Sequence, residues 1–392
     1  MNKIKVNFHI TTMFFGGIEK ILLTYLNNFD RCIFDVSLSI SYYMGKELEV
    51  LIPYVPSDVK INYIVKPRFL NNVKIKKKQK VNYTYLERCI DNLIFKHITR
   101  AWHFVKFYYM SQHYDIVINF DLCPFLTRSL SPVIGVLHFN LASQTTTKRD
   151  KANVYKQFSL SSAIVLISQD MKDECLVNYP KFADKFYVVF NPFDIAKIRE
   201  MALKPFNNVF GNYIVSVCRL EESQKDVTSL IKAFDILIHQ YGYSGNLVLV
   251  GDGTSRIQLE SLVLRLNLSS HVFFEGIQQN PFNYMQNAKM CVLSSKYEGL
   301  PSVVIEALIV GVPVIASNCP TGSREILQDG EFGALFEVGN YIQLANIMYS
   351  LLMNYSLQHE LIQKSIRRAN DFGLKAALNS FYSMIDEIVH GK

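Results

Sequence analysis

The sequence lacks any run of 18 or more apolar residues, the length that a membrane-spanning helix requires. Its most apolar stretch, from Val303 to Ala316, is interrupted by Glu306 and Pro313. A secretory leader pattern is also missing, because the first ten residues, MNKIKVNFHI, alternate polar and apolar side chains as a strand does. We therefore expect a cytoplasmic chain that does not cross a membrane.

Charged side chains are scarce as well. They make up 19% of the 392 residues, against about 25% in an average soluble protein, whereas apolar residues make up 49%. This composition excludes a disordered chain, and the length suits two domains of roughly 150–200 residues each. No internal repeat occurs at a fixed period.

The seven cysteines form no Cys-x-x-Cys pair and no Cys/His cluster with the spacing of a metal site. An odd number of scattered cysteines indicates reduced, mostly buried thiols in a cytosolic protein. We expect neither a disulfide framework nor a metal centre.

Positive charge is concentrated in one segment. The net charge of the chain is +7, and residues 60–106 alone hold twelve Lys/Arg and only two acids, so the remainder is slightly acidic. A local excess of this kind indicates an anionic partner for one face and argues against a nucleic-acid-binding protein.

Short apolar runs alternate with amphipathic segments along the whole chain, which is typical of parallel sheets with crossover helices. A first helix is expected from Gly17 to about Asn28, and a later one is expected to be capped by Asp226. The chain from about Tyr341 is helical in pattern. The polar, proline-containing stretch after Asn191 predicts a linker between two α/β domains. The predicted strands are 3–10, 34–40, 59–65, 115–119, 133–138, 163–167, 186–190, 213–217, 247–250, 272–274, 290–293 and 313–316.

The sharpest motif is YEGLPSVVIEA at 297–307, directly after an apolar strand. Gly299 permits a tight turn, and Pro301 suits the first helical position, where a missing N–H costs little. The N–H groups of Ser302 and Val303 would then face a ligand. A helix N-terminus of this kind attracts an anion such as a diphosphate.

Two carboxylates bracket this anion site. Glu298 lies just before the helix, and Glu306 lies roughly 7.5 Å further along its axis. Each could bind one end of a longer ligand. The alternative reading of Glu306 is purely structural, because a lone glutamate in the apolar run VVIEALIV has to be bonded to a neighbouring backbone or basic group.

Two features of the first half also fit a ligand site. Gly16 and Gly17 follow the first strand, where a glycine pair lets the backbone approach a phosphate or sugar closely, although ordinary turns use the same pair. His138 ends the strand VIGVLH, and the carboxyl end of a parallel strand faces the ligand crevice. A histidine bonded within its own loop is the alternative.

The spacing of Glu298 and Glu306 resembles the Glu-x7-Glu motif of the family-4 glycosyltransferases. VSVCRLEESQKD at 215–226 is similar to a basic segment of that family, with Arg219 and Lys225 in the basic positions and Cys218 where a glycine is usual. The resemblance is strong over roughly 186–330 and weaker before it.

Two further segments complete the resemblance. VGDG at 250–253 matches the family's Gly-x-Gly turn with Gly251 and Gly253, and GVPVIASNCPTGSREIL at 311–327 looks like a subgroup that acts on surface polysaccharides. The resemblance implies the GT-B fold, in which two Rossmann-like doubly wound α/β domains face each other across a cleft. The expected parts are an acceptor-side domain at 1–193, a nucleotide-sugar-binding domain at 194–375, and a C-terminal helix at 376–392 that crosses back to the first domain.

The resemblance further implies a retaining glycosyltransferase that needs no metal or other cofactor. Arg219 and Lys225 would stabilise the leaving diphosphate, unless they are solvated surface cations. Glu298 would hold the donor sugar, Glu306 would bond the ribose, and His138 would orient the sugar or the developing charge. The implied donor is a nucleotide-sugar, with UDP preferred, and the implied acceptor is a glycan or a lipid-linked sugar. The implied donor-binding set is Gly16, Gly17, Arg219, Lys225, Gly251, Gly253, Glu298, Gly299, Leu300, Pro301, Ser302, Val303 and Glu306.

Residues 66–110 interleave basic and aromatic side chains, and Leu86, Ile90 and Leu93 form a helical apolar stripe. A basic helix with aromatic residues suits an anionic membrane surface. This predicts peripheral attachment to the inner face of the cell membrane. The alternative is that the stripe packs on the sheet and the lysines are simply solvated.

Three other functions stay open at this point. Another GT-B enzyme, such as a nucleotide-sugar epimerase or a phosphorylase, shares the expected fold, although no cofactor-bearing lysine for a phosphorylase is identified. A non-catalytic sugar-nucleotide-binding protein is a second option. An NAD enzyme is disfavoured, because the first glycine-rich turn lacks the full G-x-G-x-x-G pattern.

Overall fold

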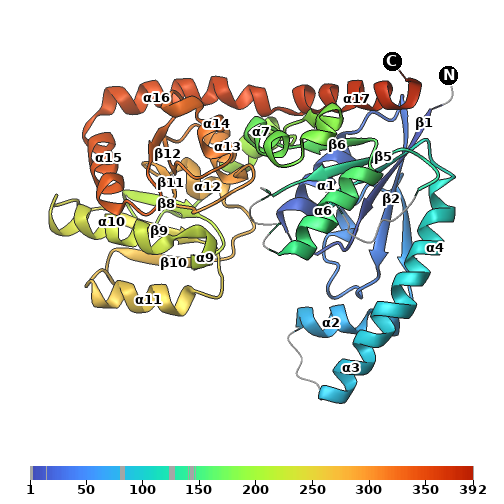
Figure 1. Cartoon of the computed structure of the whole chain (residues 1–392). Helices are drawn as coiled ribbons and strands as arrows, with labels where there is room; N and C mark the ends of the chain where they lie inside the picture. The colour runs from blue at the N-terminus through green and yellow to red at the C-terminus, as the bar shows by residue number, and fades with distance from the viewer. Residues whose placement is uncertain are drawn as a thin grey trace. The chain divides into compact units, whose positions relative to one another are not determined.

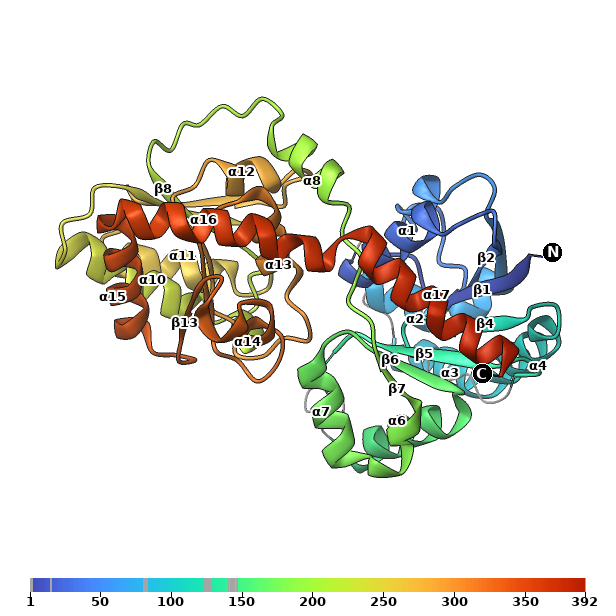
Figure 2. The same cartoon turned by 90° about the horizontal axis from the view of Figure 1, so that it is seen from above.

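The computed structural model of the chain describes residues 3–14, 16–79, 84–122, 129–139, 141, 145 and 147–391, with the backbone alone at 77–79 and 96. The chain divides into two compact units (Figures 1 and 2). Unit 1 comprises Met1–Ile167, Lys172–Pro192 and Lys375–Lys392, and unit 2 comprises Ser168–Met171 and Phe193–Leu374. The units are described one at a time below.

Unit 1 is built on a seven-stranded sheet in the order β3-β2-β1-β4-β5-β6-β7, and every pair in it is parallel. Strands β4, β5 and β6 are almost wholly apolar, as a parallel sheet covered on both sides favours. One face of β1 and β2 instead carries buried polar residues, Asn7, His9, Ser37, Ser39 and Ser41, which hydrogen-bond to one another. The chain reverses its direction of winding between β1 and β4, which are neighbours in the sheet but far apart in sequence. The strands are β1 (Ile4–Ile10), β2 (Phe34–Tyr42), β3 (Lys60–Val65), β4 (Ile116–Asn119), β5 (Val133–Leu137), β6 (Ala163–Leu166) and β7 (Phe186–Val188).

The alternation of side chains along β1 decides which helices cover each face of this sheet. Phe8 packs against Tyr25 of α1 (Gly17–Asn28), while the adjacent His9 points to the other face and contacts His103 and Phe107 of α4 (Arg100–Ser111). The other helices of unit 1 are α2 (Asn72–Gln79), α3 (Tyr85–Leu93), α6 (Lys148–Leu160), α7 (Gln169–Asn178) and α17 (Leu374–His390), together with a π-helical turn at Ile94–Thr99.

The last helix of the chain, α17, packs on unit 1. Phe381 lies against Tyr25, and the backbone N–H of Asp30 donates to the hydroxyl of Tyr382 at 2.8 Å. Tyr187 of β7 donates from its hydroxyl to Glu387 at 3.0 Å. The C-terminal residues therefore complete the core of the unit that begins the chain, and in Figure 2 α17 runs along this sheet.

Unit 2 repeats the architecture with six parallel strands in the order β10-β9-β8-β11-β12-β13. Here the winding reverses between β8 and β11. Helices lie on both sides of the sheet (Figure 1). The strands are β8 (Tyr213–Val217), β9 (Asn246–Val250), β10 (Val272–Gly276), β11 (Cys291–Leu293), β12 (Val314–Ser317) and β13 (Ala334–Phe336). The helices are α8 (Ile195–Ala202), α9 (Glu222–Lys225), α10 (Val227–His239), α11 (Arg256–Arg265), α12 (Phe282–Gln286), α13 (Ser302–Val310), α14 (Ser323–Ile326), α15 (Tyr341–Met353) and α16 (Tyr355–Ala369).

The core of unit 2 joins β8 and β9 to the apolar face of α10. Ile214, Leu247 and Phe234 are fully buried in one cluster. Three fully buried side chains of this size stabilise the unit by about 1.5–3 kcal/mol each relative to their exposed state. The sheet is therefore a firm support for the loops at its carboxyl edge.

Two local features differ from the sequence prediction. Asp226 occupies the position before α10, but its carboxylate accepts from the hydroxyl of Ser229 at 2.8 Å and caps no backbone N–H. Glu222 instead accepts from the backbone N–H of Thr228, because the short helix α9 holds it beside the start of α10. The predicted polar linker contains α8, which Asp194 caps by accepting from the backbone N–H of Lys197 at 3.0 Å.

Candidate functional site

Two neighbouring loops meet at the carboxyl edge of the sheet in unit 2, where the winding reverses between β8 and β11. In open α/β sheets, ligands bind at this kind of switch point. One loop leads from β8 into α9 and carries Arg219 and Lys225, and the other leads from β11 into α13 and carries Glu298. The structure therefore brings three of the predicted site residues to one edge of unit 2.

A buried ion pair joins the two loops. The ammonium of Lys225 donates to Oε1 of Glu298, and their side chains are only 14% and 9% exposed. Ser295 donates from its hydroxyl to the same carboxylate oxygen at 2.5 Å. An ammonium has three N–H groups, so the bond to Glu298 leaves donors on Lys225 for an anionic ligand.

Further hydrogen bonds hold the two loops together. The hydroxyl of Ser294 donates to the backbone oxygen of Lys225 at 3.0 Å, and the backbone N–H of Lys296 donates to the backbone oxygen of Gln224 at 2.7 Å. The exposed Arg219 donates to the side chain of Gln224 at 3.0 Å. The fold therefore holds Lys225 in a buried pair, whereas Arg219 is an exposed cation with one side-chain partner.

Gly251 and Gly253 let their own loop pack closely against the loop that carries Arg219. A Cβ on Gly251 would lie 1.9 Å from the backbone oxygen of Cys218, and one on Gly253 would lie 2.2 Å from that of Leu220. Gly251 also has φ of 134°, a region that L side chains rarely adopt. These glycines let two backbone segments touch, so their structural role is evident from the packing alone.

The helix α13 begins at Ser302, and Pro301 precedes it with φ −68° and ψ 101°. Pro301 is therefore the N-cap residue, and its prediction as the first helical residue was wrong by one position. The physical argument is unchanged, because the N–H groups of Ser302 and Val303 have no carbonyl partner inside the helix. Gly299 and Leu300 are buried beneath this helix start.

Sequence reasoning missed the loop that supports this turn. Thr321 donates from its hydroxyl to the backbone oxygen of Glu298. Gly322 has φ of 83°, and a Cβ there would lie 2.6 Å from the backbone oxygen of Gly299. The Thr-Gly pair after β12 is the signal that could have identified it, because a glycine following a strand often marks a close backbone approach.

Glu306 lies in the second turn of α13 and is half-buried, not enclosed. Its charge contributes to the raised pKa of Cys291, about 12, although burial of that thiol is the larger cause. The carboxylate of Glu306 therefore lies near Cys291 of β11.

The remaining predicted residues, Gly16, Gly17 and His138, belong to unit 1. Gly16 precedes α1 and Gly17 is its first residue; the carboxylate of Glu19 fills the space beside Gly16, where a Cβ would lie 2.4 Å from Oε2. His138 follows β5 and is buried. Burial lowers its pKa to about 4 despite a hydrogen bond with the backbone of Phe120, so the ring is neutral at pH 7. Its Nε2 atom is shielded from solvent and has no hydrogen-bond partner within the described part of the chain.

Comparison with known proteins agrees with this geometry. Residues 202–368 match the family model for glycosyl transferases group 1. The chain has the fold of HepE from Anabaena, solved with UDP, at a TM-score of 0.75 over 98% of this chain and 100% of that one, with 18% identity. The chain has this GT-B fold, and residues 202–368 are similar to the group 1 glycosyl transferases. The predicted fold is thereby confirmed.

Two curated relatives match about half of this chain. An uncharacterized glycosyltransferase of Methanocaldococcus jannaschii is 34% identical over 44% of this chain and 44% of its own length. The N-acetylgalactosamine-N,N'-diacetylbacillosaminyl-diphospho-undecaprenol 4-alpha-N-acetylgalactosaminyltransferase of Campylobacter jejuni is 28% identical over 51% of this chain and 53% of its own length. The chain thus spans about half the length of these relatives.

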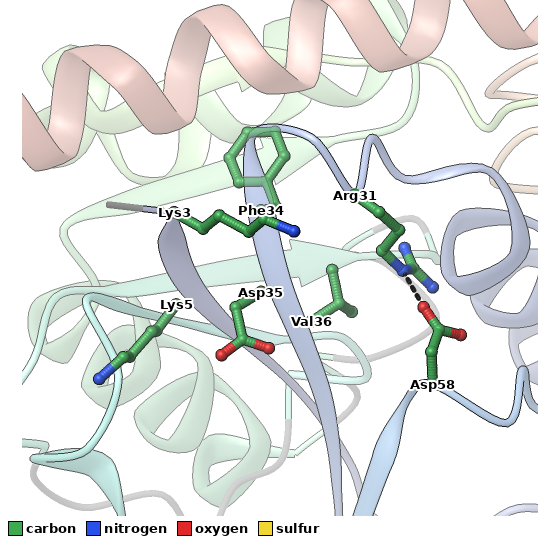
Figure 3. Close-up of a pocket in the computed structure, with 7 residues that line it drawn as sticks. All are labelled: Lys3, Lys5, Arg31, Phe34, Asp35, Val36 and Asp58. Carbon is green, nitrogen blue, oxygen red and sulfur yellow. Dashed lines mark hydrogen bonds and ion pairs between the residues drawn. The ribbon is translucent and has the colours of Figure 1, made fainter. Parts of the chain in front are cut away.

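The polar loops described above lie at the carboxyl edge of the sheet in unit 2. A separate hollow of about 650 Å³ lies at the amino ends of β1 and β2 in unit 1 (Figure 3). Its cations Lys3 and Lys5 are exposed, and Arg31 is paired with Asp58 at 2.6 Å. We do not assign this hollow to the donor, because it lies at the amino ends of the strands, whereas ligands of such sheets bind at the carboxyl ends. Among the described residues, no group of three His, Cys, Asp or Glu is arranged to hold a metal, and no helix is long and apolar enough to span a membrane.

Proposed function

We propose that this GT-B protein is a retaining glycosyltransferase. It moves a sugar from a UDP-sugar to a lipid-linked or oligosaccharide acceptor in surface polysaccharide biosynthesis. The observation that carries the proposal is the buried pair of Lys225 and Glu298, next to Arg219 and the N-terminus of α13. The UDP in the HepE complex and the diphospho-undecaprenol acceptor named for the Campylobacter relative support the two substrate classes.

In this proposal the diphosphate of the donor lies against the start of α13. Arg219 and Lys225 are the cations that balance its charge, and the first-turn N–H groups of the helix add a positive partial charge. Glu298 accepts hydrogen bonds from the donor sugar, and Glu306 accepts from the ribose. Because the cations are already in place, we propose that transfer needs no metal ion.

The reaction exchanges one bond at the anomeric carbon for another on the same face of the sugar. The bond to the diphosphate oxygen breaks, the acceptor oxygen forms the new bond, and the acceptor proton leaves with the diphosphate. Negative charge therefore grows on the diphosphate, which is where the two cations and the helix N-terminus act. His138, neutral at pH 7, donates or accepts a hydrogen bond near the reacting sugar.

Replacing Glu306 with alanine is expected to raise the dissociation constant for UDP about 10- to 100-fold, since hydrogen bonds to a carboxylate contribute about 1.5–3 kcal/mol. The measurement is UDP-dependent thermal stabilisation, followed by calorimetric titration. GDP is tested in parallel because the base is assigned by analogy. Glu337→Ala, an exposed glutamate of the same unit, is the control and should bind UDP normally. Equal UDP affinity in Glu306→Ala and the control would remove Glu306 from the donor site.

We also propose that unit 1 attaches the protein to the inner face of the cell membrane through α3, the π-helical turn and α4. The first part of the predicted stripe is exposed, with Leu86 69%, Ile90 49% and Leu93 62% accessible, which supports the proposal. The adjacent Ile94 packs against a core cluster of the unit instead. A Thr84–Glu87 capping box begins α3, and the helix touches the rest of the unit through the buried Asp91, which pairs with Lys76 at 3.0 Å. Figure 1 shows these helices extending beyond the sheet of unit 1.

The exposed face continues along α4. Trp102 and Val105 are each half-exposed and line an open, mostly apolar groove with Tyr109. Arg88 and Arg100 lie on the same helical segment and bring positive charge to it. Apolar and aromatic side chains beside cations match the interface of an anionic bilayer, where each cation near the surface adds about 1 kcal/mol.

Binding to vesicles of phosphatidylglycerol is expected at low salt and should weaken as salt screens the cations. The double variant Trp102→Ser/Val105→Ser should reduce vesicle binding about 10-fold or more, because two apolar side chains no longer enter the interface. Flotation of the full chain with vesicles measures this. The matched control, Val209→Ser/Ile257→Ser, changes two exposed apolar residues of unit 2 and should bind normally. Equal flotation of both variants would refute this assignment.

A further inference from the structure

Asp121 lies at the carboxyl end of β4, where the sheet of unit 1 reverses its winding between β1 and β4. This is the equivalent in unit 1 of the switch point that holds Lys225 and Glu298 in unit 2. Ligands bind outside strand ends at such points. No role for Asp121 follows from the sequence motifs.

One carboxylate oxygen of Asp121 has a structural partner and the other has none. Oδ2 accepts from the backbone N–H of Thr11, at the end of β1, at 2.9 Å. Oδ1 is shielded from solvent and makes no hydrogen bond with any residue that the structure describes, although Asp121 as a whole is partly exposed. Leaving such an oxygen unpaired is costly, so it points to a missing donor.

The backbone beside Asp121 is strained. Leu122 has φ of 46°, a left-handed conformation that is unfavourable for a bulky side chain. The side chain of Leu122 occupies the space beside Gly135 in β5, where a Cβ would lie 2.7 Å from it. Strain of this kind persists where the surrounding structure holds a functional group in place.

The other groups around Asp121 are suited to a sugar. Tyr42 ends β2, and the amino group of Lys74 lies 4.6 Å from the centre of its ring. Burial raises the pKa of Asp121, while its hydrogen bonds with Thr11 and the charge of Lys74 oppose that rise. His138 follows the next strand in the sheet and contacts Phe120 with ring centres 4.8 Å apart. The ring of Tyr42, the carboxylate of Asp121 and the ring of His138 therefore lie at the carboxyl ends of β2, β4 and β5. The cation Lys74 lies beside Tyr42.

We propose that Asp121 binds the acceptor, with Oδ1 accepting a hydrogen bond from a hydroxyl of its terminal sugar. The proposal rests on the glycosyltransferase function proposed above and adds the residue that selects the acceptor. A carboxylate oxygen only accepts hydrogen bonds, and a sugar hydroxyl supplies the donor that Oδ1 lacks. Such charge-assisted bonds are stronger than neutral ones and discriminate against a sugar that lacks the hydroxyl.

The test compares two identical substitutions at the two ends of β4. Asp121→Asn keeps the size of the side chain but loses its charge. Asp115→Asn is the matched control, because the exposed Asp115 carboxylate accepts from the backbone N–H of Lys5 at 2.7 Å, at the other end of β1. Saturation-transfer NMR of the full chain with methyl galactoside and methyl N-acetylgalactosaminide measures sugar binding. UDP-dependent thermal stabilisation of all three proteins measures the donor site separately.

Wild type and Asp115→Asn are expected to transfer saturation to at least one glycoside, and Asp121→Asn to bind that glycoside about 10- to 100-fold more weakly. All three proteins should be stabilised equally by UDP. If Asp121→Asn does not fold, Asp121→Ser replaces it. Equal glycoside binding in wild type and the Asp121 variant overturns the inference, as does the absence of binding in wild type. Loss of UDP stabilisation in wild type would instead refute the glycosyltransferase proposal.

Discussion

Replacing Lys225 with methionine is expected to lower turnover about 100- to 1000-fold, the usual effect of removing one donor that stabilises transition-state charge. Methionine keeps most of the length and the apolar stem of the side chain but supplies no N–H. Charge on the diphosphate is larger in the transition state than in the bound donor, so the loss should fall on kcat more than on KM. The measurement is steady-state release of UDP from a UDP-sugar.

The same substitution should also destabilise unit 2, because it leaves the carboxylate of Glu298 buried without its cation. Removing one partner of a buried pair costs about 3–5 kcal/mol. The double variant Lys225→Met/Glu298→Gln should regain most of the free energy of unfolding, since no unpaired charge remains, yet it should stay inactive. Denaturant unfolding and turnover are therefore measured on both variants.

Lys289→Met is the control for this experiment. Lys289 is exposed and lies at the amino end of β11, whereas Glu298 follows the carboxyl end of the same strand. The control should change neither turnover nor stability by more than about 0.5 kcal/mol. A double variant that recovers both stability and turnover would show that Lys225 is needed only to hold Glu298.

Replacing Gly251 with alanine is expected to destabilise unit 2 by about 3 kcal/mol or more and to abolish UDP binding. The added Cβ would lie 1.9 Å from the backbone oxygen of Cys218, and two backbone segments have no side-chain freedom with which to relieve the clash. The loop carrying Arg219 would have to move. Thermal unfolding with and without UDP gives both effects in one series.

The control Gly242→Ala distinguishes the effect of the steric clash on stability from the effect of the unfavourable backbone conformation. Gly242 also has positive φ, 68°, but a Cβ there meets nothing within 4 Å. This control should cost only the conformational penalty, about 1 kcal/mol, and should keep UDP binding. If Gly251→Ala unfolds no earlier than Gly242→Ala, the backbone contact with Cys218 has no role in holding the site.

The predicted donor residues lie on loops that follow strands, and this explains which parts of the site the sequence reveals. Short apolar runs identify strands, and the residues after each run fall at the carboxyl edge, so Glu298 and His138 could be placed at that edge from the pattern. Arg219 was selected through the family resemblance. The pairing of Lys225 with Glu298 could not, because 73 residues separate them and only the adjacency of β8 and β11 joins their loops. The support from Thr321 and Gly322 depends on the same long-range packing.

Asp121 is a candidate site residue that the sequence could not reveal. Its sequence neighbourhood, NFDLC, contains no recognisable motif. Only the positions of Thr11 on a neighbouring strand and of Leu122 beside Gly135 reveal that one oxygen is paired and the other is not. Shielding of a single atom is a property of packing, and no spacing rule encodes it.

The sequence by itself determined the two α/β domains, most of the strands along the chain and the family resemblance of roughly residues 186–330, because periodicity and local motifs act within a few residues. It left open whether Leu86, Ile90 and Leu93 pack inward, and which cations meet which carboxylates. The tertiary structure decided both: the first by leaving α3 exposed, the second by placing distant strands side by side. Burial and pairing depend on what lies across from a residue in space, and that is fixed only when the sheet assembles.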